Sequence, residues 1–408
     1  MSGAFAAAVT GVGVVSAAGL DVAANWSMVL RGRSTALAHE DLAGLPVDMA
    51  CRVPDFDAGR LFGGQRARGM DRYVHLALLA AREAVASSGI DIETWDPTRV
   101  AVVLGTGLAG VATSETQQSR LLESGPHKVS PLTLPMCLSN MAAAQVAIEF
   151  GARGPNLSVS TACASGATAI GVGRDLLRAG AADVVIAGAA DAAITPLQIA
   201  AFHRIRALSR GTAGAGTASR PFDRDRDGFV IGEGAGVVVM EREQQAQARG
   251  ARVHGFVRGY GASCDAHHVT APDPTGAGAE HAMRAALADA HLPASQVVYV
   301  NAHGTSTRLN DAIEAAVVHR LLGDRVAVSS TKGVTGHTLG ASGAIEAVYS
   351  LLALREGQLP PTANLVCPDE SNQLDLVRDT PRAHRGEVAM SNSFGFGGHN
   401  AVLVLTAT

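Results

Sequence analysis

The chain has few charged and few aromatic residues, no long apolar run and little cysteine. Charged residues make up 17% of its 408 residues and aromatic residues 4%, while apolar residues reach 47%. Such a chain can bury enough apolar surface to offset the entropy of ordering, which excludes a disordered protein. The formal net charge of −4 argues against a general nucleic-acid-binding protein. No uninterrupted run of 18 apolar residues occurs, so we expect no membrane span.

The five cysteines are far apart, odd in number and form no C-x-x-C pair: Cys51, Cys137, Cys163, Cys264 and Cys367. This spacing argues against a disulfide framework and a zinc ribbon, and it favours a reducing cytoplasm. The apolar start, "MSGAFAAAVTGVGVVSAAG", lacks the basic region of a signal peptide. We therefore predict that it forms a first core strand.

Short β-branched runs alternate with alanine-rich helical patterns. The pattern predicts an amphipathic helix over 70–89 that ends at Gly89. It predicts strands over 6–16, 99–107, 182–191, 234–243, 296–304, 325–333 and 401–407. Continuous apolar strands between helices indicate an α/β fold whose sheet is covered on both faces.

A weak internal similarity relates the two parts of the chain. One strand leads to Cys163 and a helix rich in small residues, and a later strand leads through His337 to a similar helix. Both helices end in Leu-Leu, a few residues and then Gly. We therefore predict a duplicated α/β unit with halves at 1–250 and 251–408, joined near "QARGARVHG".

Cys163 lies between the strand "LSVST" and the helical pattern "ASGATAIGVGRDLLRAG". A lone cysteine in such a setting is often a small buried hydrophobe. A helix N-terminus, however, carries positive potential and unpaired N–H groups, which favour a thiolate. We therefore predict a nucleophile at this turn, with a thiol pKa below the usual value of about 8.5.

Two histidines could serve this thiol. His303 and His337 each follow an apolar strand in a polar loop. In an open α/β sheet the carboxyl ends of strands form the ligand crevice, so the three side chains could converge there. Lys332 follows the strand "VAVSST", which favours a partly buried site over a surface lysine. Glu314 or Glu346 could pair with Lys332 or orient a histidine, and the sequence leaves this choice open.

Three further segments stand out. "SNSFGFGGHNAVLVL" (391–405) can offer a backbone N–H to an oxyanion and phenylalanines to a cavity. It is neither a dinucleotide fingerprint nor a phosphate loop. The loop 209–228 is long enough to be functional. His267 and His268 have no nearby third ligand, so they are weak evidence for a metal.

The motifs "TACASG", "NAHGTST", "TKGVTGHTLGASG" and "NSFGFGGHN", in this order, closely resemble the elongating β-ketoacyl-acyl-carrier-protein synthases of the thiolase superfamily, the 3-oxoacyl-ACP synthase 2 type. The resemblance covers nearly the whole chain. It implies a thiolase-like fold, in which duplicated βαβαβαβ halves stack as five α-β-α-β-α layers, and a dimer. It also implies decarboxylative condensation of malonyl-ACP with an acyl chain to give 3-oxoacyl-ACP, with substrates held on phosphopantetheine and no redox cofactor.

The resemblance also implies roles for individual residues. Cys163 would be the acyl-accepting nucleophile, His303 and His337 the pair that supports decarboxylation, and Lys332 the holder of the network near His337. Phe396, with Phe394 beside it, would gate the site, and its N–H would join that of Cys163 in an oxyanion hole. Contacts to the pantetheine arm would come from Thr270, Thr305 and Thr307. Some relatives hold a monovalent cation near residues that match Asn301, Glu346, Ser391 and Asn392; no other metal is expected.

The alternatives differ in their residues. A degradative thiolase would need a second cysteine near the C-terminus, a starter condensing enzyme would have Asn where His337 stands, and a noncatalytic chain-length subunit usually lacks the cysteine. Two pathways remain open: a homodimeric fatty-acid enzyme, or the ketosynthase of a type II, possibly polyene, polyketide heterodimer with a chain-length factor. Leu108 and Thr133 match positions that line the acyl pocket in relatives. Basic candidates for docking the acidic carrier protein are Arg66, Arg68, Arg204 and Arg206.

Overall fold

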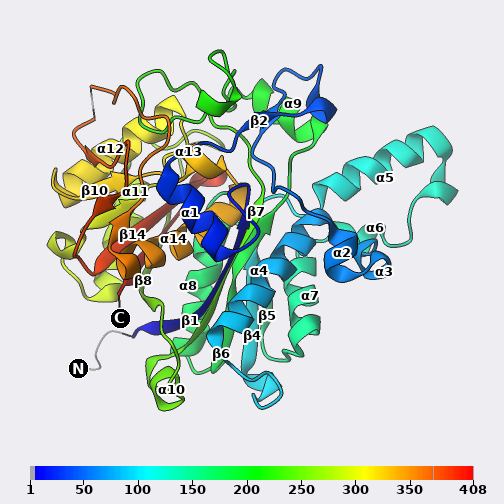
Figure 1. The fold of residues 1–408 in the computed structure, drawn as a ribbon, viewed down its shortest axis with the longest axis horizontal. Coiled ribbons are helices and arrows are strands. Elements are labelled where there is room, and N and C mark those ends of the chain that lie inside the picture. The colour runs from blue at the N-terminus through cyan, green and yellow to red at the C-terminus, as the bar shows by residue number, and fades with distance from the viewer. Residues whose placement is uncertain (1–4, 371, 408) are drawn as a thin grey trace.

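The computed structural model describes residues 5–370 and 372–407, and its centre is a mixed sheet (Figure 1). Eleven strands of these residues form that sheet. In spatial order they are β12 (Asp375–Leu376), β10 (Ala327–Ser329), β9 (Tyr299–Asn301), β14 (Val388–Gly395), β15 (His399–Thr406), β8 (Gly255–Cys264), β1 (Ala7–Ser16), β7 (Gly234–Arg242), β6 (Val184–Asp191), β4 (Val100–Gly105) and β5 (Asn156–Val159).

The strand order repeats itself in the two parts of the sheet. The series β5-β4-β6-β7-β1 and the series β10-β9-β14-β15-β8 have the same connections and the same pattern of parallel and antiparallel neighbours. The two series join where Ala7–Val9 of β1 pairs antiparallel with Gly255–Val257 of β8. This repeat is the duplicated unit that the sequence similarity predicts.

Helices form the layers on either side of the two half-sheets. The helices α8 (Ser165–Arg178) and α14 (Ser342–Glu356) lie between them and contact strands of both. The outer faces are covered by α4 (Arg72–Ser88) and α7 (Met141–Phe150) on one side, and by α11 (Ala277–Ala290) and α12 (Arg308–Leu322) on the other. The order α-β-α-β-α confirms the expected five layers.

Small residues let the two central helices approach each other. A Cβ at Gly166 of α8 would lie 2.5 Å from the backbone nitrogen of Ala344 in α14, a distance that real contacts do not reach. Both helices end as expected in a left-handed glycine region, at Gly180 (φ 73°) and Gly357 (φ 64°). The central layer thus joins the halves directly behind the functional residues.

Further helices are α1 (Val22–Arg31), α5 (Val111–Ser124), α6 (Thr133–Cys137) and α9 (Pro196–Arg204). Shorter elements are β2 (Leu37–Ala38), β3 (Met49–Ala50), α2 (Ala58–Phe62), α3 (Gly64–Ala67), α10 (Glu243–Ala248), α13 (Lys332–Thr335), β11 (Gln358–Leu359) and β13 (Arg382–Ala383). Figure 1 shows α5 extending away from the body of the molecule. Within residues 5–370 and 372–407, no helix combines the length and apolar character needed to cross a bilayer.

The sequence-based elements agree with this fold. The predicted helix at 70–89 is α4, which ends at Gly89 (φ 63°), and each predicted strand is present within its range or overlaps it. The strand before Cys163, β5, is an edge strand of the sheet and is only partly buried. The loop 209–228 contains only one short 3-10 turn, at Ala215–Thr217, as its lack of periodicity indicates.

Candidate active site

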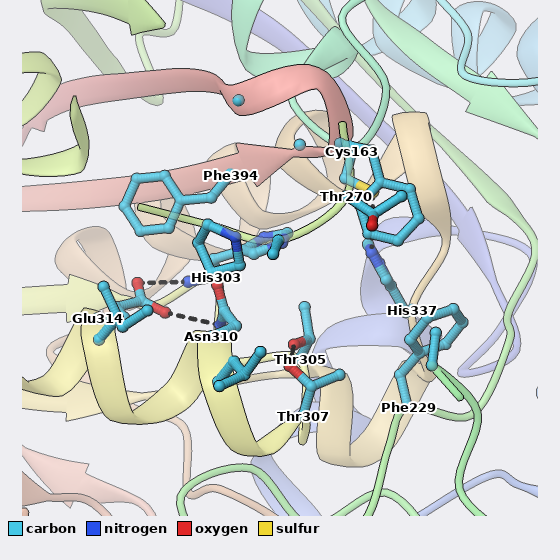
Figure 2. Close-up of a pocket in the computed structure, with 18 of the residues that line it drawn as sticks. Cys163, Phe229, Thr270, His303, Thr305, Thr307, Asn310, Glu314, His337 and Phe394 are labelled. Carbon is cyan, nitrogen blue, oxygen red and sulfur yellow. Dashed lines mark hydrogen bonds between the residues drawn. The ribbon is translucent and has the colours of Figure 1, made fainter. Parts of the chain in front are cut away.

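The carboxyl ends of strands from both halves meet at one cavity of about 320 Å³ (Figure 2). Cys163 follows β5, His303 follows β9, His337 follows β10, and Phe396 follows β14. All four line the cavity. The topology therefore brings together the cysteine of one half and the two histidines of the other, as the spacing of the motifs predicts.

Cys163 stands in a tight turn, not inside a helix. Ala162 has φ 49°, and α8 begins only at Ser165. The backbone N–H groups of Cys163 and Phe396 face the sulfur, and their role as an oxyanion hole stays a prediction. The residue is partly accessible from the cavity, but protein atoms surround its sulfur.

The expected low thiol pKa is wrong. Burial raises the pKa of Cys163 to about 12, although the Lys332 charge and the two N–H groups favour the thiolate. The loss of hydration outweighs the positive potential of the helix N-terminus, which the sequence argument took as dominant. At neutral pH the free site therefore holds a thiol.

His337 is the base nearest to this thiol. Its Nε2 lies 3.2 Å from the Cys163 sulfur, and its Nδ1 lies 3.1 Å from the Ser342 hydroxyl. Two backbone hydrogen bonds fix the residue, because its N–H donates to Val230 O at 2.7 Å and its carbonyl accepts from Gly232 N at 2.9 Å. Burial, and then the nearby Lys332 charge, lower the pKa of His337 well below its usual value. The imidazole is thus neutral.

His303 faces His337 across the cavity, with ring centroids 5.4 Å apart. Glu314 holds its loop by accepting the backbone N–H of His303 at 2.8 Å and of Gly304 at 2.7 Å. Burial, followed by the charge of Lys332, lowers the pKa of His303 well below normal. Both histidines are therefore neutral, and each can donate one N–H into the cavity.

Lys332 is completely buried, more so than the sequence suggested, and its ammonium pairs with Glu346. Burial raises the pKa of Glu346 to about 7 even though the Lys332 charge opposes the shift. The structure thus separates the two glutamates left open by the sequence: Glu346 pairs with Lys332, and Glu314 orients the His303 loop.

The glycine-rich loop and the candidate pantetheine residues form the outer part of the cavity. Phe394 and Phe396 line it, together with Thr270, Thr305 and Thr307. The hydroxyls of Thr305 and Thr307 lie 2.9 Å apart (Figure 2). The N–H of Gly397 donates to Val269 O at 2.8 Å, so the glycine-rich loop rests on the segment that carries Thr270.

Most of the remaining candidate residues for acyl binding and carrier docking lie outside this cavity. Leu108 and Thr133 do not line this cavity, so their assignment to an acyl pocket stays a prediction. Among the docking candidates, Arg206 lines the cavity, whereas Arg204 is exposed at the end of α9. Arg66 and Arg68 do not line the cavity; they lie in and beside α3, and Arg66 pairs with Glu149 at 2.5 Å.

Several lining residues were missed by the sequence analysis. The ring of Phe229 packs edge-on against His337 at 5.1 Å and against Phe202 of α9 at 5.5 Å. Asp227, two residues before Phe229, and Arg308, the first residue of α12, also line the cavity. The loop 209–228 was recognised as a functional candidate, but nothing in its composition indicates that its end folds back over His337.

A cluster of buried polar atoms lies between the carboxyl end of β9, the middle of β14 and α14. Within the part of the chain that the structure describes, partners are lacking for both polar side-chain atoms of Asn301 and for Ser391 Oγ, Asn392 Oδ1 and Glu346 Oε2. These include the oxygen donors that a monovalent cation requires. Across residues 5–370 and 372–407, no group of three or more His, Cys, Asp or Glu side chains could hold a metal ion, and His267 and His268 are exposed.

The fold and the Cys-His-His cavity define a condensing, acyl-transferring enzyme. Family models agree: the beta-ketoacyl synthase N-terminal domain matches residues 5–246, and the C-terminal domain matches residues 254–366. The chain belongs to the β-ketoacyl synthase family.

Individual relatives are similar over almost their full length. The chain is 44% identical to 3-oxoacyl-[acyl-carrier-protein] synthase 2 of Synechocystis sp. (strain ATCC 27184 / PCC 6803 / Kazusa), over 97% of this chain and 96% of the relative. It is 33% identical to a chain of the ishigamide ketosynthase/chain length factor, with a TM-score of 0.91 and coverage of 99% of both chains. It is 30% identical to a chain of AntDE:AntF, a type II PKS acyl-carrier protein in complex with its ketosynthase bound to the hexaketide, with a TM-score of 0.92 and coverage of 99% and 100%.

Proposed function

We propose that the chain condenses malonyl-ACP with an acyl group held on Cys163, releasing CO2 and giving 3-oxoacyl-ACP. The observation that carries this proposal is the 3.2 Å approach of His337 Nε2 to the Cys163 sulfur inside a cavity that His303 also lines. The relatives, which include an acyl-carrier-protein synthase and a ketosynthase in complex with its carrier protein, support the substrate class.

In the first step the Cys163 sulfur attacks the carrier-bound thioester while His337 Nε2 accepts the thiol proton. The backbone N–H groups of Cys163 and Phe396 stabilise the tetrahedral oxyanion, and each such donor contributes roughly 3–4 kcal/mol in comparable sites. The carbon–sulfur bond to the carrier then breaks, and the carrier thiolate leaves with the proton from His337. The products are acyl-Cys163 and free carrier thiol.

In the second step malonyl-carrier enters along Thr305 and Thr307. The bond between its α-carbon and carboxylate breaks, and CO2 leaves an enolate whose oxygen accepts the N–H groups of His303 and His337. Their depressed pKa values keep both imidazoles neutral, and the Ser342 hydroxyl can accept from or donate to His337 Nδ1, which accommodates either tautomer. The carbanion attacks the acyl-Cys163 carbonyl, the bond between that carbonyl and the sulfur breaks, and the departing thiolate takes up one proton from solvent through His337.

The ion pair of Lys332 and Glu346 is buried beside the two histidines and affects their protonation. The buried ammonium disfavours protonation of both histidines. A protonated imidazole could only donate, whereas the neutral ring can both accept a proton and donate a hydrogen bond. No step requires a redox cofactor, and we infer that the enzyme needs only carrier-bound substrates. We also infer a cytoplasmic location, because the dispersed cysteines fit a reducing compartment.

The unpartnered oxygens near Asn301 and Ser391 support a monovalent cation site in the same region. A cation there would lie near Glu346 and would offset part of its buried negative charge. Thermal unfolding in buffers that contain only K⁺, only Na⁺ or only tetramethylammonium tests this site. Equal stability in all three buffers would count against it.

A second subunit of the same fold fits the exposed apolar surface near α5. Leu122 of α5 is 76% exposed, Leu134 of α6 69%, and Ile148 of α7 69%. The edge strand β5, adjacent to α7, leaves one side of its backbone unpaired within the described chain. We infer a dimer, either of two copies or with a homologous chain-length factor, as in the related ketosynthase/chain length factor structures. A division of each chain near residue 250, at an exposed turn, fits the same duplicated architecture.

The choice between fatty-acid and polyketide elongation is tested by reconstitution. Purified protein is supplied with acyl-carrier and malonyl-carrier, alone or with a candidate homologous subunit, and the products are identified by mass spectrometry. A 3-oxoacyl-carrier product made by the chain alone supports the homodimeric fatty-acid enzyme. Products that require the second subunit support the polyketide ketosynthase. No 3-oxoacyl product under either condition refutes the proposed condensation.

A further inference from the structure

Asp191 is a charged residue at the centre of the molecule that the proposed reaction does not use. It is the last residue of β6 and is 0% exposed. An aspartate this deeply buried is costly unless its oxygens are fully hydrogen-bonded. Among the residues with described positions, no lysine, arginine or histidine nitrogen forms an ion pair with it.

Four donors surround this carboxylate. Its Oδ1 accepts the Thr106 hydroxyl at 2.7 Å and the Leu108 N–H at 3.1 Å. Its Oδ2 accepts the N–H of Gly107 at 2.8 Å and of Gly340 at 2.7 Å. Because three of these partners can only donate, they fit an ionised carboxylate, which can only accept. The site is therefore built for a negative charge.

These four bonds connect the loop after β4 to the segment that follows His337. Gly340 lies in the 3-10 turn Leu339–Ala341, three residues after His337 and just before α14. On the other side, Thr106 belongs to the loop after β4, and the Ser165 hydroxyl links that loop to the cysteine turn by contacts with Thr106 O at 3.3 Å and Ala162 O at 2.7 Å.

Glycine is required where the carboxylate enters. A Cβ at Gly107 would lie 3.0 Å from Asp191 Oδ2, and one at Gly340 would lie 2.6 Å from the same oxygen. Any larger residue at Gly340 would push the carboxylate or the His337 loop away. The close fit indicates that the distance between these loops is set by Asp191.

We propose that Asp191 is a positioning residue that holds the Cys163 turn and the His337 loop at their reactive separation, and that its buried charge acts on the Cys163 sulfur. This inference rests on the proposed function. The charged and titratable groups around Cys163 are His303, His337, the buried cation Lys332 and the buried anion Asp191. The two histidines are neutral, so Lys332 and Asp191 act on the sulfur with opposite signs.

The charges of Asp191 and Lys332 shift the pKa of the Cys163 thiol in opposite directions. After burial, which is the largest cause, the negative charge of Asp191 raises the pKa of Cys163, while the Lys332 charge lowers it. Burial raises the pKa of Asp191 itself, and its hydrogen bonds oppose that shift. Removing the Asp191 charge should therefore make the thiolate easier to form. Loosened loops would also hydrate the sulfur, so Thr106→Val, which weakens the same contacts and keeps the charge, separates the two causes.

The test uses two variants with nearly unchanged side-chain volume. Asp191→Asn removes the charge and turns one acceptor into a donor, whereas Thr106→Val removes one hydrogen bond and keeps the charge. Iodoacetamide alkylation of Cys163 is followed by peptide mass spectrometry across pH, with the exposed Cys264 as a reference thiol in the same molecule. Turnover with carrier-bound substrates is measured in parallel.

We expect Asp191→Asn to raise the alkylation rate of Cys163 about threefold or more at pH 8, since each unit of pKa changes the thiolate fraction about tenfold. The Cys264 rate should not change. Thr106→Val should leave Cys163 alkylation unchanged. Both variants should lower kcat, Asp191→Asn by about tenfold or more, with little change in KM, because the alignment of the reacting groups is lost.

Unchanged or slower alkylation of Cys163 in folded Asp191→Asn would overturn the proposal, as would an unchanged kcat. If Asp191→Asn does not yield folded protein, Thr106→Val decides alone, and an unchanged kcat in that variant would overturn the positioning role. Failure of the proposed function is recognised separately, because the wild-type protein would then form no acyl-Cys163 although its alkylation could still be measured.

Discussion

The Nε2 atom of His337 lies 3.2 Å from the sulfur of Cys163, and both side chains are in their neutral forms at neutral pH. This pair differs from a thiolate–imidazolium pair, in which the nucleophile is charged before substrate arrives. Here the proton moves as the substrate reacts, so the enzyme at rest presents a poorly reactive thiol to other electrophiles.

Replacing the nucleophile should separate the two half-reactions. Cys163→Ala should form no acyl-enzyme, because the sulfur is removed, but it should still release CO2 from malonyl-carrier through His303 and His337. Intact-protein mass spectrometry and CO2 release measure the two steps. Cys264→Ala, at an exposed cysteine, serves as the control and should retain both. Acylation of Cys163→Ala would rule out the assigned nucleophile.

The two histidines should differ in their effect on acylation. His303→Ala should lower condensation by about 10²-fold or more while acyl-Cys163 still forms, because His303 lies 5.4 Å from His337 rather than on the sulfur. His337→Ala should lower both steps. Single-turnover acylation followed by product formation distinguishes them. Equal acylation in both variants would show that His337 is not the base, and His281→Ala, at an exposed position of α11, provides the control.

Alkylation of Cys163 should require high pH. Its folded pKa is raised to about 12, so the thiolate fraction, and with it the rate, should rise with pH throughout the range from 7 to 11. Near neutral pH the exposed Cys264 should react faster than Cys163. Peptide-level mass spectrometry after short exposure to iodoacetamide gives both rates. A plateau for Cys163 near pH 7 would contradict the raised pKa.

Breaking the Lys332–Glu346 pair should destabilise the fold. Lys332→Met leaves a carboxylate buried without its cation, and removal of one partner from such a pair costs about 3–5 kcal/mol. The double variant Lys332→Met/Glu346→Leu should recover part of this loss, although not the activity. Denaturant unfolding of the two proteins provides the comparison. Equal stability of the single and double variants would argue against a coupled pair.

Charge reversal at the cavity mouth should weaken use of carrier-bound substrates. Arg206 is exposed and lines the cavity, so Arg206→Glu should raise KM for acyl-carrier and repel its acidic surface. A small acyl thioester without the carrier protein should react at an unchanged rate. Arg325→Glu, exposed before the amino end of β10, is the matched control. An unchanged KM for Arg206→Glu would remove this residue from the docking surface.

Most of the fold and the central residues could be predicted from the sequence, because they depend on local signals. Continuous apolar and β-branched runs predicted the strands, glycine predicted the end of α4, and Cys163, His303 and His337 were each predicted to follow a strand. The duplication could also be predicted, since the segments around Cys163 and His337 share a strand followed by a helix of small residues.

Effects that depend on the environment in three dimensions could not be predicted in the same way. The predicted direction of the Cys163 pKa shift was wrong, because desolvation depends on every atom around the sulfur and not only on the helix that follows it. The partner of Lys332 and the contact of Phe229 with His337 involve residues from separate segments. Leu108 and Thr133 do not line the cavity that this chain forms around Cys163.

The large distance in sequence between Cys163 and His337 also determines when the active site can form during synthesis. Cys163 and His337 are 174 positions apart, and each belongs to a different half of the sheet. A nascent chain that has left the ribosome only through β7 carries the sulfur without the histidine that takes its proton. The active site can therefore form only late in synthesis, and we expect a prematurely terminated first half to be inactive.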